Sequence, residues 1–162
     1  MSAAETLVAL LRANGRTCAT AESCTGGGVG SAITSVPGSS EVFMGGVISY
    51  SNDVKHRVLG VSEENLAKYG AVSSQVAAEM AEGARRLMRT DIAVSVTGIA
   101  GPGGGSAEKP VGLVWFGIAN ATATRTEKAL FQGDRERIRA QAAIHAIGML
   151  TVEAVKGAGG DA

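Results

Sequence analysis

The sequence is poor in several features that mark particular classes of protein. It has 3 Phe, 2 Tyr and 1 Trp among 162 residues, which is too few for the stacking platform of a single-strand nucleic-acid binder. Basic and acidic side chains balance at 15 each, so no net charge attracts the chain to nucleic acid or to an anionic membrane. We therefore expect neither of these as a partner.

Histidine, cysteine and long apolar runs are scarce as well. His56 and His145 lie far apart and near no cluster of ligands, so we expect no metal site. No run reaches the roughly 18 apolar residues that a membrane-spanning helix requires. Cys18 and Cys24 are close together in a chain without a signal-peptide pattern, and we expect reduced thiols and a cytoplasmic location.

The familiar motifs of nucleotide binding and hydrolysis are also missing. The sequence contains no Gly-Lys pair of a Walker A loop, no G-x-S-x-G elbow and no H-E-x-x-H, and no G-x-G-x-x-G follows the first predicted strand. Ser106 and Lys109 formally match the S-x-x-K of penicillin-binding enzymes. That motif begins a helix, whereas this pair lies among glycines directly before Pro110.

Glycine, in contrast, is abundant. The 23 glycines are about twice the usual share of ~7%. They cluster at 26–30, 45–46, 98–105 and 157–160, and the first three clusters fall between strand and helix signals, as functional turns do. We expect one domain over residues 1–156 and a flexible tail over 157–162.

Helical and strand patterns alternate along the chain. Amphipathic or small-residue patterns predict helices at 3–13, 25–34, 52–60, 62–70, 73–89 and 133–157. Apolar runs predict strands at 16–22, 42–50, 91–98, 111–120 and 123–132, the last two as a hairpin. This order favours an α/β fold, a three-layer α/β/α sandwich with a mixed, mainly parallel sheet.

The first segment suited to chemistry is "AESCTGGG", residues 21–28, at a predicted strand-to-helix junction. Glycines there let backbone N–H groups approach an anion, and a helix N-terminus adds positive potential. We expect Thr25, Gly26 and Gly27 to contact the substrate. A tight turn capped by Ser23 or Thr25 is the simpler alternative, and these residues alone leave open which side chain is a nucleophile.

The second segment is "ISYSNDVK", which places Tyr50, Asn52 and Lys55 at the end of a strand and in the first turn of the next helix. A lysine there can point back to the carboxyl edge of the sheet, where open α/β sheets bind ligands. Partial desolvation would lower its pKa and make it a general base. The alternative is a solvated surface charge.

The third segment is "TGIAGPGGGSAEKPVG", in which Thr97 ends a predicted strand. The glycines that follow would let backbone and ligand approach closely, and we assign substrate contacts to Gly98, Gly101 and Gly104.

Arg135 and Arg139 lie in the first turns of the last predicted helix. Cations are unfavourable at a helix N-terminus, which favours a role in binding an anion such as a phosphate. The alternative is a solvated face that pairs with Asp134 and Glu136.

Five segments in this order resemble one family: "TAESCTGGG", "GGVISYSNDVK", "GAVS", "VSVTGIAGPGGGSAEKPVGLVWFGIA" and "GDRERIR". The family is that of the nicotinamide-nucleotide amidases, a deamidase domain found at the C-terminus of competence/damage-inducible CinA proteins and also as a stand-alone protein. The resemblance covers roughly residues 5–156. It implies hydrolysis of the carboxamide of nicotinamide mononucleotide to nicotinate mononucleotide and ammonia, in pyridine-nucleotide recycling, with no cofactor and a small-molecule nucleotide as partner.

The resemblance also assigns roles to residues. It makes Ser23 the nucleophile and Lys55 the base, and Tyr50 and Thr97 fall on motif positions of the site. The phosphate ligand stays open between the glycine backbone at 101–105, Arg135 and Arg139. Two alternatives are a non-catalytic nucleotide-binding or regulatory module related to CinA proteins, and a thiol enzyme that uses Cys24. A homodimer is the expected assembly for an α/β domain with few surface charges.

Overall fold

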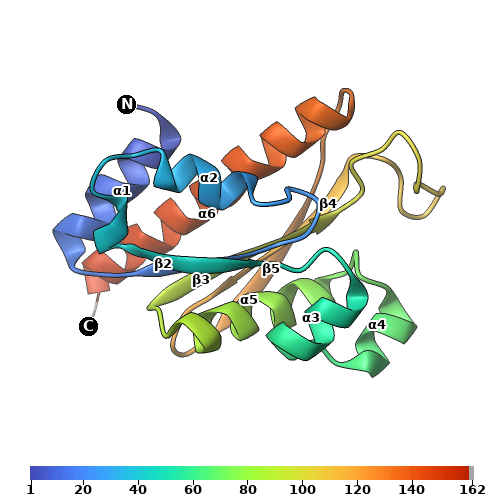
Figure 1. The fold of residues 1–162 in the computed structure, drawn as a ribbon, viewed down its shortest axis with the longest axis horizontal. Helices are drawn as coiled ribbons and strands as arrows, with labels where there is room; N and C mark the ends of the chain where they lie inside the picture. Colours follow the sequence, from blue (N-terminus) through green and yellow to red (C-terminus); the bar gives the residue numbers. More distant parts are fainter. Residues whose placement is uncertain (161–162) are drawn as a thin grey trace.

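A computed structural model describes residues 1–160 and contains a single five-stranded sheet between two layers of helices (Figure 1). The strands lie in the order β2-β1-β3-β4-β5. Pairing is parallel among β2, β1 and β3 and antiparallel from β3 through β4 to β5, so the sheet is mixed, as predicted. The strand bounds are β1 Cys18–Glu22, β2 Phe43–Ile48, β3 Ile92–Gly98, β4 Leu113–Ala119 and β5 Thr124–Leu130.

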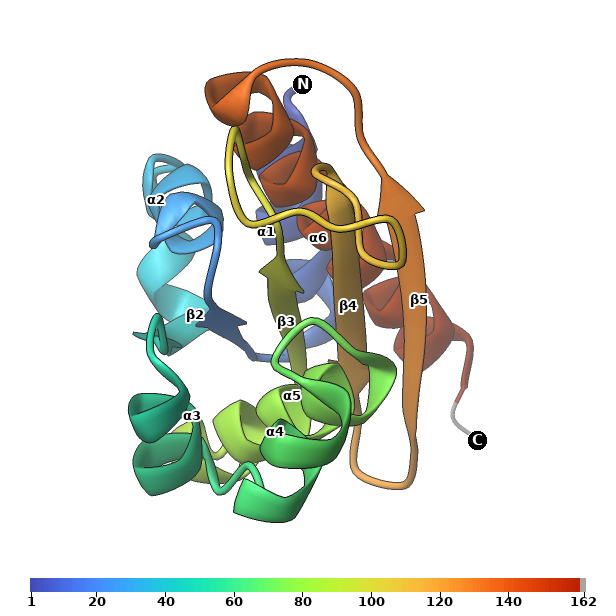
Figure 2. The same ribbon diagram turned by 90° about the vertical axis from the view of Figure 1, so that its right-hand side faces the viewer.

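The helices divide between the two faces of the sheet (Figures 1 and 2). One face carries α1 Ala3–Asn14, α2 Gly28–Thr34 and α6 Arg135–Gly160, and the other carries α3 Asn52–Leu59, α4 Glu63–Tyr69 and α5 Ser74–Met88. A short 3₁₀ helix, Ser39–Glu41, precedes β2. This arrangement confirms the predicted three-layer α/β/α sandwich. None of the helices within residues 1–160 is both long and apolar enough to cross a membrane.

Two apolar clusters fill the space on either side of the sheet. The larger lies under α1, α2 and α6 and includes the fully buried Leu7, Leu11, Phe116 and Leu150. The smaller lies under α5 and includes Leu59, Val61, Val76 and Met80. These clusters hold the helices against the sheet and so fix the places where the loops at its carboxyl edge begin and end.

Helix α5 packs directly on the sheet because β4 carries a glycine beneath it. A Cβ added to Gly117 would lie 2.4 Å from the carbonyl oxygen of Ala77. The neighbouring strand contributes Ser95, whose Oγ donates a hydrogen bond of 2.6 Å to that same carbonyl. The contact brings the start of α5, and the loop before it, close to the end of β3.

Two element boundaries differ from the sequence prediction by three residues, and the others differ by at most two. Helix α2 begins at Gly28, not at Thr25, because Gly26 and Gly27 have φ of 58° and 101° and cannot continue a right-handed helix. Helix α6 extends to Gly160, into the segment 157–162 expected as a flexible tail. Residues 161–162 of that segment lie outside the described residues, and the flexibility of the segment stays a prediction.

The carboxyl ends of β1 and β3, the glycine-rich loop 99–112 and the first turn of α6 gather at one end of the sheet (Figure 2). Segments that are more than 100 residues apart in the sequence therefore meet at this edge. For example, the guanidinium of Arg139 contacts the turn after β1. The site residues predicted from sequence are drawn from these segments.

Candidate active site

Ser23 and Lys55 form a hydrogen-bonded pair at the carboxyl edge of the sheet. Ser23 follows β1 directly, and its amide donates to the carbonyl of Val96 on β3 at 2.9 Å, which fixes the backbone at this point. Lys55 lies in the first turns of α3, whose N-terminus is capped by Ser51. The Nζ of Lys55 lies 2.9 Å from the Oγ of Ser23, and both side chains are buried.

The surroundings of Lys55 favour its neutral form. The side chain is 1% exposed, and no carboxylate within the described residues forms an ion pair with it. Burial lowers the pKa of Lys55 to about 8. A group with that pKa is neutral in roughly a tenth of the molecules at pH 7, so a free base is available without any change of structure.

Two carbonyl groups orient the amine of Lys55. Nζ donates to the carbonyl oxygens of Ser49 at 2.6 Å and of Tyr50 at 3.3 Å. Ser49 is itself fully buried and tied to β1, because its amide donates to the carbonyl of Glu22 at 2.7 Å. A neutral amine has two N–H groups and one lone pair. With both N–H groups on these carbonyls, the lone pair faces Ser23.

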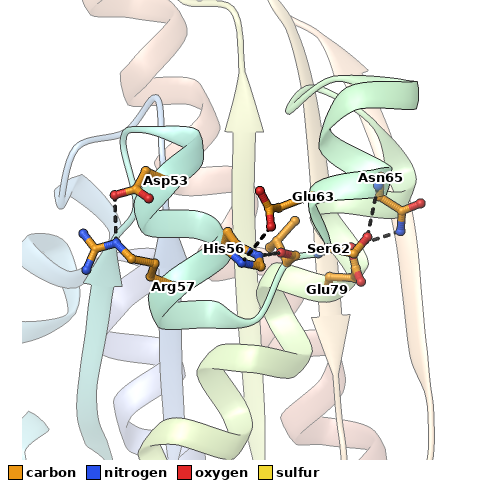
Figure 3. Close-up of polar contacts among 8 residues, drawn as sticks. Asp53, His56, Arg57, Ser62, Glu63, Asn65 and Glu79 are labelled. Atoms are coloured by element: carbon orange, nitrogen blue, oxygen red, sulfur yellow. Dashed lines mark hydrogen bonds and ion pairs between the residues drawn. The ribbon is translucent and has the colours of Figure 1, made fainter.

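Helix α3, which carries the lysine, is fastened to its neighbours by polar side chains (Figure 3). His56 places Nδ1 2.7 Å from the carbonyl oxygen of Val61 and Nε2 3.4 Å from Oε1 of Glu63 on α4. On α5, Glu79 accepts hydrogen bonds from the amide of Ser62 at 3.2 Å and from Nδ2 of Asn65 at 3.1 Å. These contacts link α3, which carries Lys55, to α4 and α5.

Glu22, the residue before the serine, is a buried anchor of the glycine turn. Its side chain is 2% exposed, and Oε1 accepts hydrogen bonds from the hydroxyl of Thr25 at 2.6 Å and the amide of Gly27 at 3.1 Å. The carboxylate also accepts from the amides of Val29 at 2.9 Å and Gly30 at 2.9 Å. The carboxylate therefore occupies the N-terminal end of α2. The sequence alone had assigned no role to Glu22.

This anchor changes what the predicted contact residues of the turn can do. The hydroxyl of Thr25 and the amide of Gly27 are engaged by Glu22, and the amide of Gly26 donates to the carbonyl of Ser23 at 3.0 Å. All three groups serve the turn itself. Among the hydrogen bonds between different residues of 1–160, none uses the amide of Cys24 or of Thr25, and both amides directly follow Ser23.

The two arginines predicted to hold an anion have different surroundings. Arg139 is partly buried, and donates from Nε to the carbonyl of Cys24 at 3.0 Å and from Nη2 to that of Thr25 at 3.2 Å. Arg135 is exposed, and its Nη1 donates to the carbonyl of Gly101 at 2.8 Å. Arg139 thus lies against the turn that follows β1, and Arg135 lies at the rim, by which we mean the solvent-exposed border of the site.

Tyr50 lies at the same rim. The residue is 64% exposed, and its hydroxyl accepts a long hydrogen bond of 3.4 Å from Nη2 of Arg135. The hydroxyl has no hydrogen bond to Ser23 or Lys55 among the described contacts, and the residue reaches the pair through its backbone carbonyl.

The remaining predicted residues lie around this centre. Thr97 is buried, and its hydroxyl donates to the carbonyl of Ala71 at 3.0 Å, which ties β3 to the loop before α5. Gly98 ends β3 against β4, where a Cβ would lie 2.7 Å from the carbonyl oxygen of Leu113. Asn52 and Gly104 are exposed, at the start of α3 and in the glycine-rich loop.

Cys24 lacks the surroundings of a nucleophile. Its thiol is buried, and burial raises the pKa to about 11, against the smaller opposing effects of its own backbone amide and of the cations Lys55 and Arg139. A thiol with this pKa is protonated at neutral pH. The geometry therefore supports the serine as nucleophile and leaves Cys24 as a packing residue.

Site and fold together define an α/β/α protein with a buried serine–lysine pair at the carboxyl edge of its sheet. The model of the CinA C-terminal domain family matches residues 1–153. The chain belongs to this family. It is also similar to solved structures, among them a CinA superfamily protein from Klebsiella pneumoniae, with a TM-score of 0.91, 35% identity and coverage of 94% of this chain and 96% of that one.

Curated relatives are of two lengths. The chain is 52% identical to the nicotinamide-nucleotide amidohydrolase PncC of Enterobacter agglomerans over 91% of both chains, and 50% identical to that of Escherichia coli K12 over 91% of this chain and 90% of the other. It is 51% identical to a putative competence-damage inducible protein of Caldanaerobacter subterraneus, of which it spans 35%. The likeness to the shorter relatives over nearly their whole length makes this chain an amidohydrolase.

Proposed function

We propose that this chain hydrolyses the carboxamide of nicotinamide mononucleotide, giving nicotinate mononucleotide and ammonia. The observation that carries the proposal is the 2.9 Å contact between Ser23 Oγ and a buried Lys55 whose pKa is lowered to about 8. The substrate is suggested by the shorter relatives, which are nicotinamide-nucleotide amidohydrolases. An amide is a poor electrophile, so the reaction needs both an activated nucleophile and a proton for the leaving group.

The first half of the reaction transfers the acyl group to the enzyme. Neutral Lys55 takes the proton from Ser23 as Oγ bonds to the carboxamide carbon, and the electron pair of the carbonyl π bond moves onto its oxygen. When this tetrahedral intermediate collapses, the C–N bond breaks and Lys55 returns the proton to the departing nitrogen. Ammonia leaves, and an ester joins Ser23 to the nicotinoyl group.

The second half returns the serine. Lys55 takes a proton from water as the water oxygen bonds to the ester carbon, and the ester C–O bond then breaks with the proton passing to Ser23. One amide and one water yield one acid and one ammonia. Lys55 is neutral again at the end, so the same pair serves both halves without a cofactor.

Recognition of the nucleotide falls to the rim of the site in this proposal. Arg135 has an exposed guanidinium anchored by one hydrogen bond to Gly101, which leaves donors for a phosphate. Tyr50, 64% exposed beside it, offers a ring face and a hydroxyl for the ribose or the pyridine ring. Arg139 is the weaker candidate for the phosphate, because two of its donors are engaged by the turn.

The test is incubation of nicotinamide mononucleotide with the wild-type chain, with Ser23→Ala and with Lys55→Met, followed by mass spectrometry of the nucleotide and an assay of ammonia. We expect conversion of amide to acid by the wild type alone. An active Ser23→Ala would overturn the mechanism. Tight binding of the nucleotide to a wild-type chain that does not turn it over would instead support the non-catalytic module considered above.

A further inference from the structure

We propose that the main-chain amides of Cys24 and Thr25 stabilise the negative oxygen of the transition state, and that Arg139 and Glu22 are positioning residues that aim them. The proposal rests on the proposed amide hydrolysis and assigns the part that Ser23 and Lys55 leave open. In acyl transfer the carbonyl oxygen becomes negative, and preorganised N–H donors near the nucleophile stabilise it.

The turn after β1 has the geometry of such a donor pair. The amide of Gly26 donates to the carbonyl of Ser23 at 3.0 Å, which closes a four-residue turn with Cys24 and Thr25 at its centre. Within residues 1–160, neither amide of these two central residues donates a hydrogen bond to another residue, and that of Cys24 interacts with its own thiol. The amide of Ser23 itself donates to Val96, so these are the next two donors along the chain from Ser23.

The other anion-binding feature of this region, the N-terminal end of α2, is already filled. Oε1 and Oε2 of Glu22 accept the amides of Gly27, Val29 and Gly30. An oxyanion bound there would displace a buried carboxylate or lie beside it, and like charges repel strongly in a buried place. The negative oxygen of the reaction is therefore directed away from α2 and toward the centre of the turn.

A hydrogen bond from Arg139 fixes the direction of one of the two amides, that of Thr25. In a trans peptide group, the carbonyl and the N–H point to opposite sides. The carbonyl of Cys24 and the amide of Thr25 belong to one such group, and Nε of Arg139 donates to that carbonyl at 3.0 Å. The N–H of Thr25 consequently points away from Arg139. A charge-assisted bond to the carbonyl also polarises the peptide group and strengthens its N–H as a donor.

The backbone at Gly26 lies close to the guanidinium of Arg139. Nη2 of Arg139 donates to the carbonyl of Thr25 at 3.2 Å, so the guanidinium spans two successive peptide groups. A Cβ added to Gly26 would lie 3.1 Å from that Nη2, and its φ of +58° disfavours a side chain as well. A glycine is favoured here, because a side chain would strain the backbone and displace the guanidinium.

Glu22 holds the opposite side of the turn. Its Oε1 accepts the hydroxyl of Thr25 at 2.6 Å together with the amides of Gly27 and Val29, and its Oε2 accepts that of Gly30. The guanidinium of Arg139, from α6, therefore binds the carbonyls of the turn, and the carboxylate of Glu22, from β1, binds the other end of the turn. These two sets of hydrogen bonds restrict the amides between them, as a preorganised site requires.

The test compares Arg139→Met with Arg137→Met, a matched control that removes a charge from an exposed residue of the same helix. For Arg139→Met we expect kcat for nicotinamide mononucleotide to fall by about 100-fold with KM nearly unchanged, and for Arg137→Met neither to change. Arg139→Lys, which cannot span both carbonyls, should lie between. In a Ser23→Ala background, Arg139→Met should leave the Kd for the nucleotide unaltered, because the amides act on the transition state.

A second readout is independent of the natural substrate. The rate at which p-nitrophenyl acetate acylates Ser23, followed by intact-protein mass spectrometry, should fall in Arg139→Met and, to a smaller extent, in Glu22→Gln. Circular dichroism at the assay temperature establishes that each variant is folded. A folded Arg139→Met that deamidates and is acylated at the wild-type rate overturns the assignment of Arg139.

The two proposals fail in different ways. A wild-type chain that is acylated by the ester but leaves nicotinamide mononucleotide intact overturns the proposed substrate, and the comparison of acylation rates still decides the role of Arg139. A wild-type chain in which Ser23 reacts with neither compound overturns both proposals.

Discussion

The Nζ of Lys55 contacts the Oγ of Ser23 at 2.9 Å across a separation of 32 residues. Ser23 directly follows β1, the strand next to the edge of the sheet, and Lys55 lies on the helix that follows the edge strand β2. The pair is assembled by parallel pairing of β1 and β2, in which Glu22 lies opposite Ile48. Lys55 is buried, and no carboxylate of residues 1–160 forms an ion pair with it. These surroundings, together with the arginine and the thiols nearby, lead to four predictions.

The rate should depend on pH through Lys55. Because the base must be neutral and its pKa is about 8, kcat/KM should rise about tenfold per pH unit up to roughly pH 8 and level off above it. The measurement is a pH–rate profile of the wild type between about pH 6 and 10. A rate that is independent of pH over this range would rule out Lys55 as the base.

The stability of the wild type relative to Lys55→Met should also depend on pH. Burial lowers the pKa of Lys55 from 10.5 in the unfolded chain to about 8, so between these values the unfolded state binds more protons and stability rises with pH. Below about pH 8 both states are protonated and the difference between the variants is constant. We expect the wild type to gain on the order of 2 kcal/mol over the variant between about pH 8 and 10.

Urea unfolding of both chains at about pH 7, 8 and 10 measures this gain. The comparison is made as a difference because Cys18 and Cys24 are present in both chains. Their pKa values are raised to about 12 and about 11 in the folded wild type, and loss of Lys55 raises that of Cys24 further, so both thiols stay mostly protonated in the two folded chains up to about pH 10. A difference in unfolding free energy that stays constant across this range would mean that Lys55 titrates normally.

Arg135→Ala should weaken binding of the nucleotide and leave the chemistry alone. Loss of a charge-assisted contact to phosphate costs about 1.5–3 kcal/mol, which raises KM by roughly 10- to 150-fold with little change in kcat. Steady-state kinetics on the nucleotide and on the same compound without its phosphate separate the effects. The phosphate-free compound should not distinguish the variant from the wild type, and an equal loss on both would place Arg135 elsewhere in the reaction.

The thiols should be unreactive in the folded protein. Burial raises the pKa of Cys18 to about 12 and that of Cys24 to about 11, and only the thiolate reacts with alkylating agents. We expect iodoacetamide at about pH 8 to modify the native chain at least 100-fold more slowly than the urea-unfolded chain. Mass spectrometry of timed samples follows the reaction, and rapid modification of native Cys24 would revive the hypothesis of a thiol enzyme.

The sequence predicts the layers of this fold because its signals are local. The apolar run of β3 and the amphipathic face of α5 each indicate their element within a few residues. The alternation of strands and helices along the chain then restricts the possible topologies. The start of α2 was predicted three residues too early, since Thr25 looks like the start of a helix. The left-handed φ values of Gly26 and Gly27 instead prolong the turn before it.

The site was predictable to the extent that it depends on motifs. Ser23 and Lys55 were assigned by resemblance, and their contact agrees with that assignment. The contacts that hold the surrounding backbone were not predictable. The carbonyl of Ser49 belongs to the backbone and has no signature in sequence, and Arg139 reaches the turn from more than 100 residues away. Glu22 did offer a signal, a carboxylate just ahead of a glycine-rich helix start.

The position of β2 at the edge of the sheet sets how firmly Ser23 and Lys55 are held together. Within residues 1–160, strand β2 pairs only with β1, and α3 follows it after three residues. Detachment of this one strand would carry Lys55 away from Ser23 and leave β1, β3, β4 and β5 in place. The free energy that keeps the enzyme competent is then that of a local opening, which is smaller than that of global unfolding. Hydrogen exchange of the β2 amides would measure it directly.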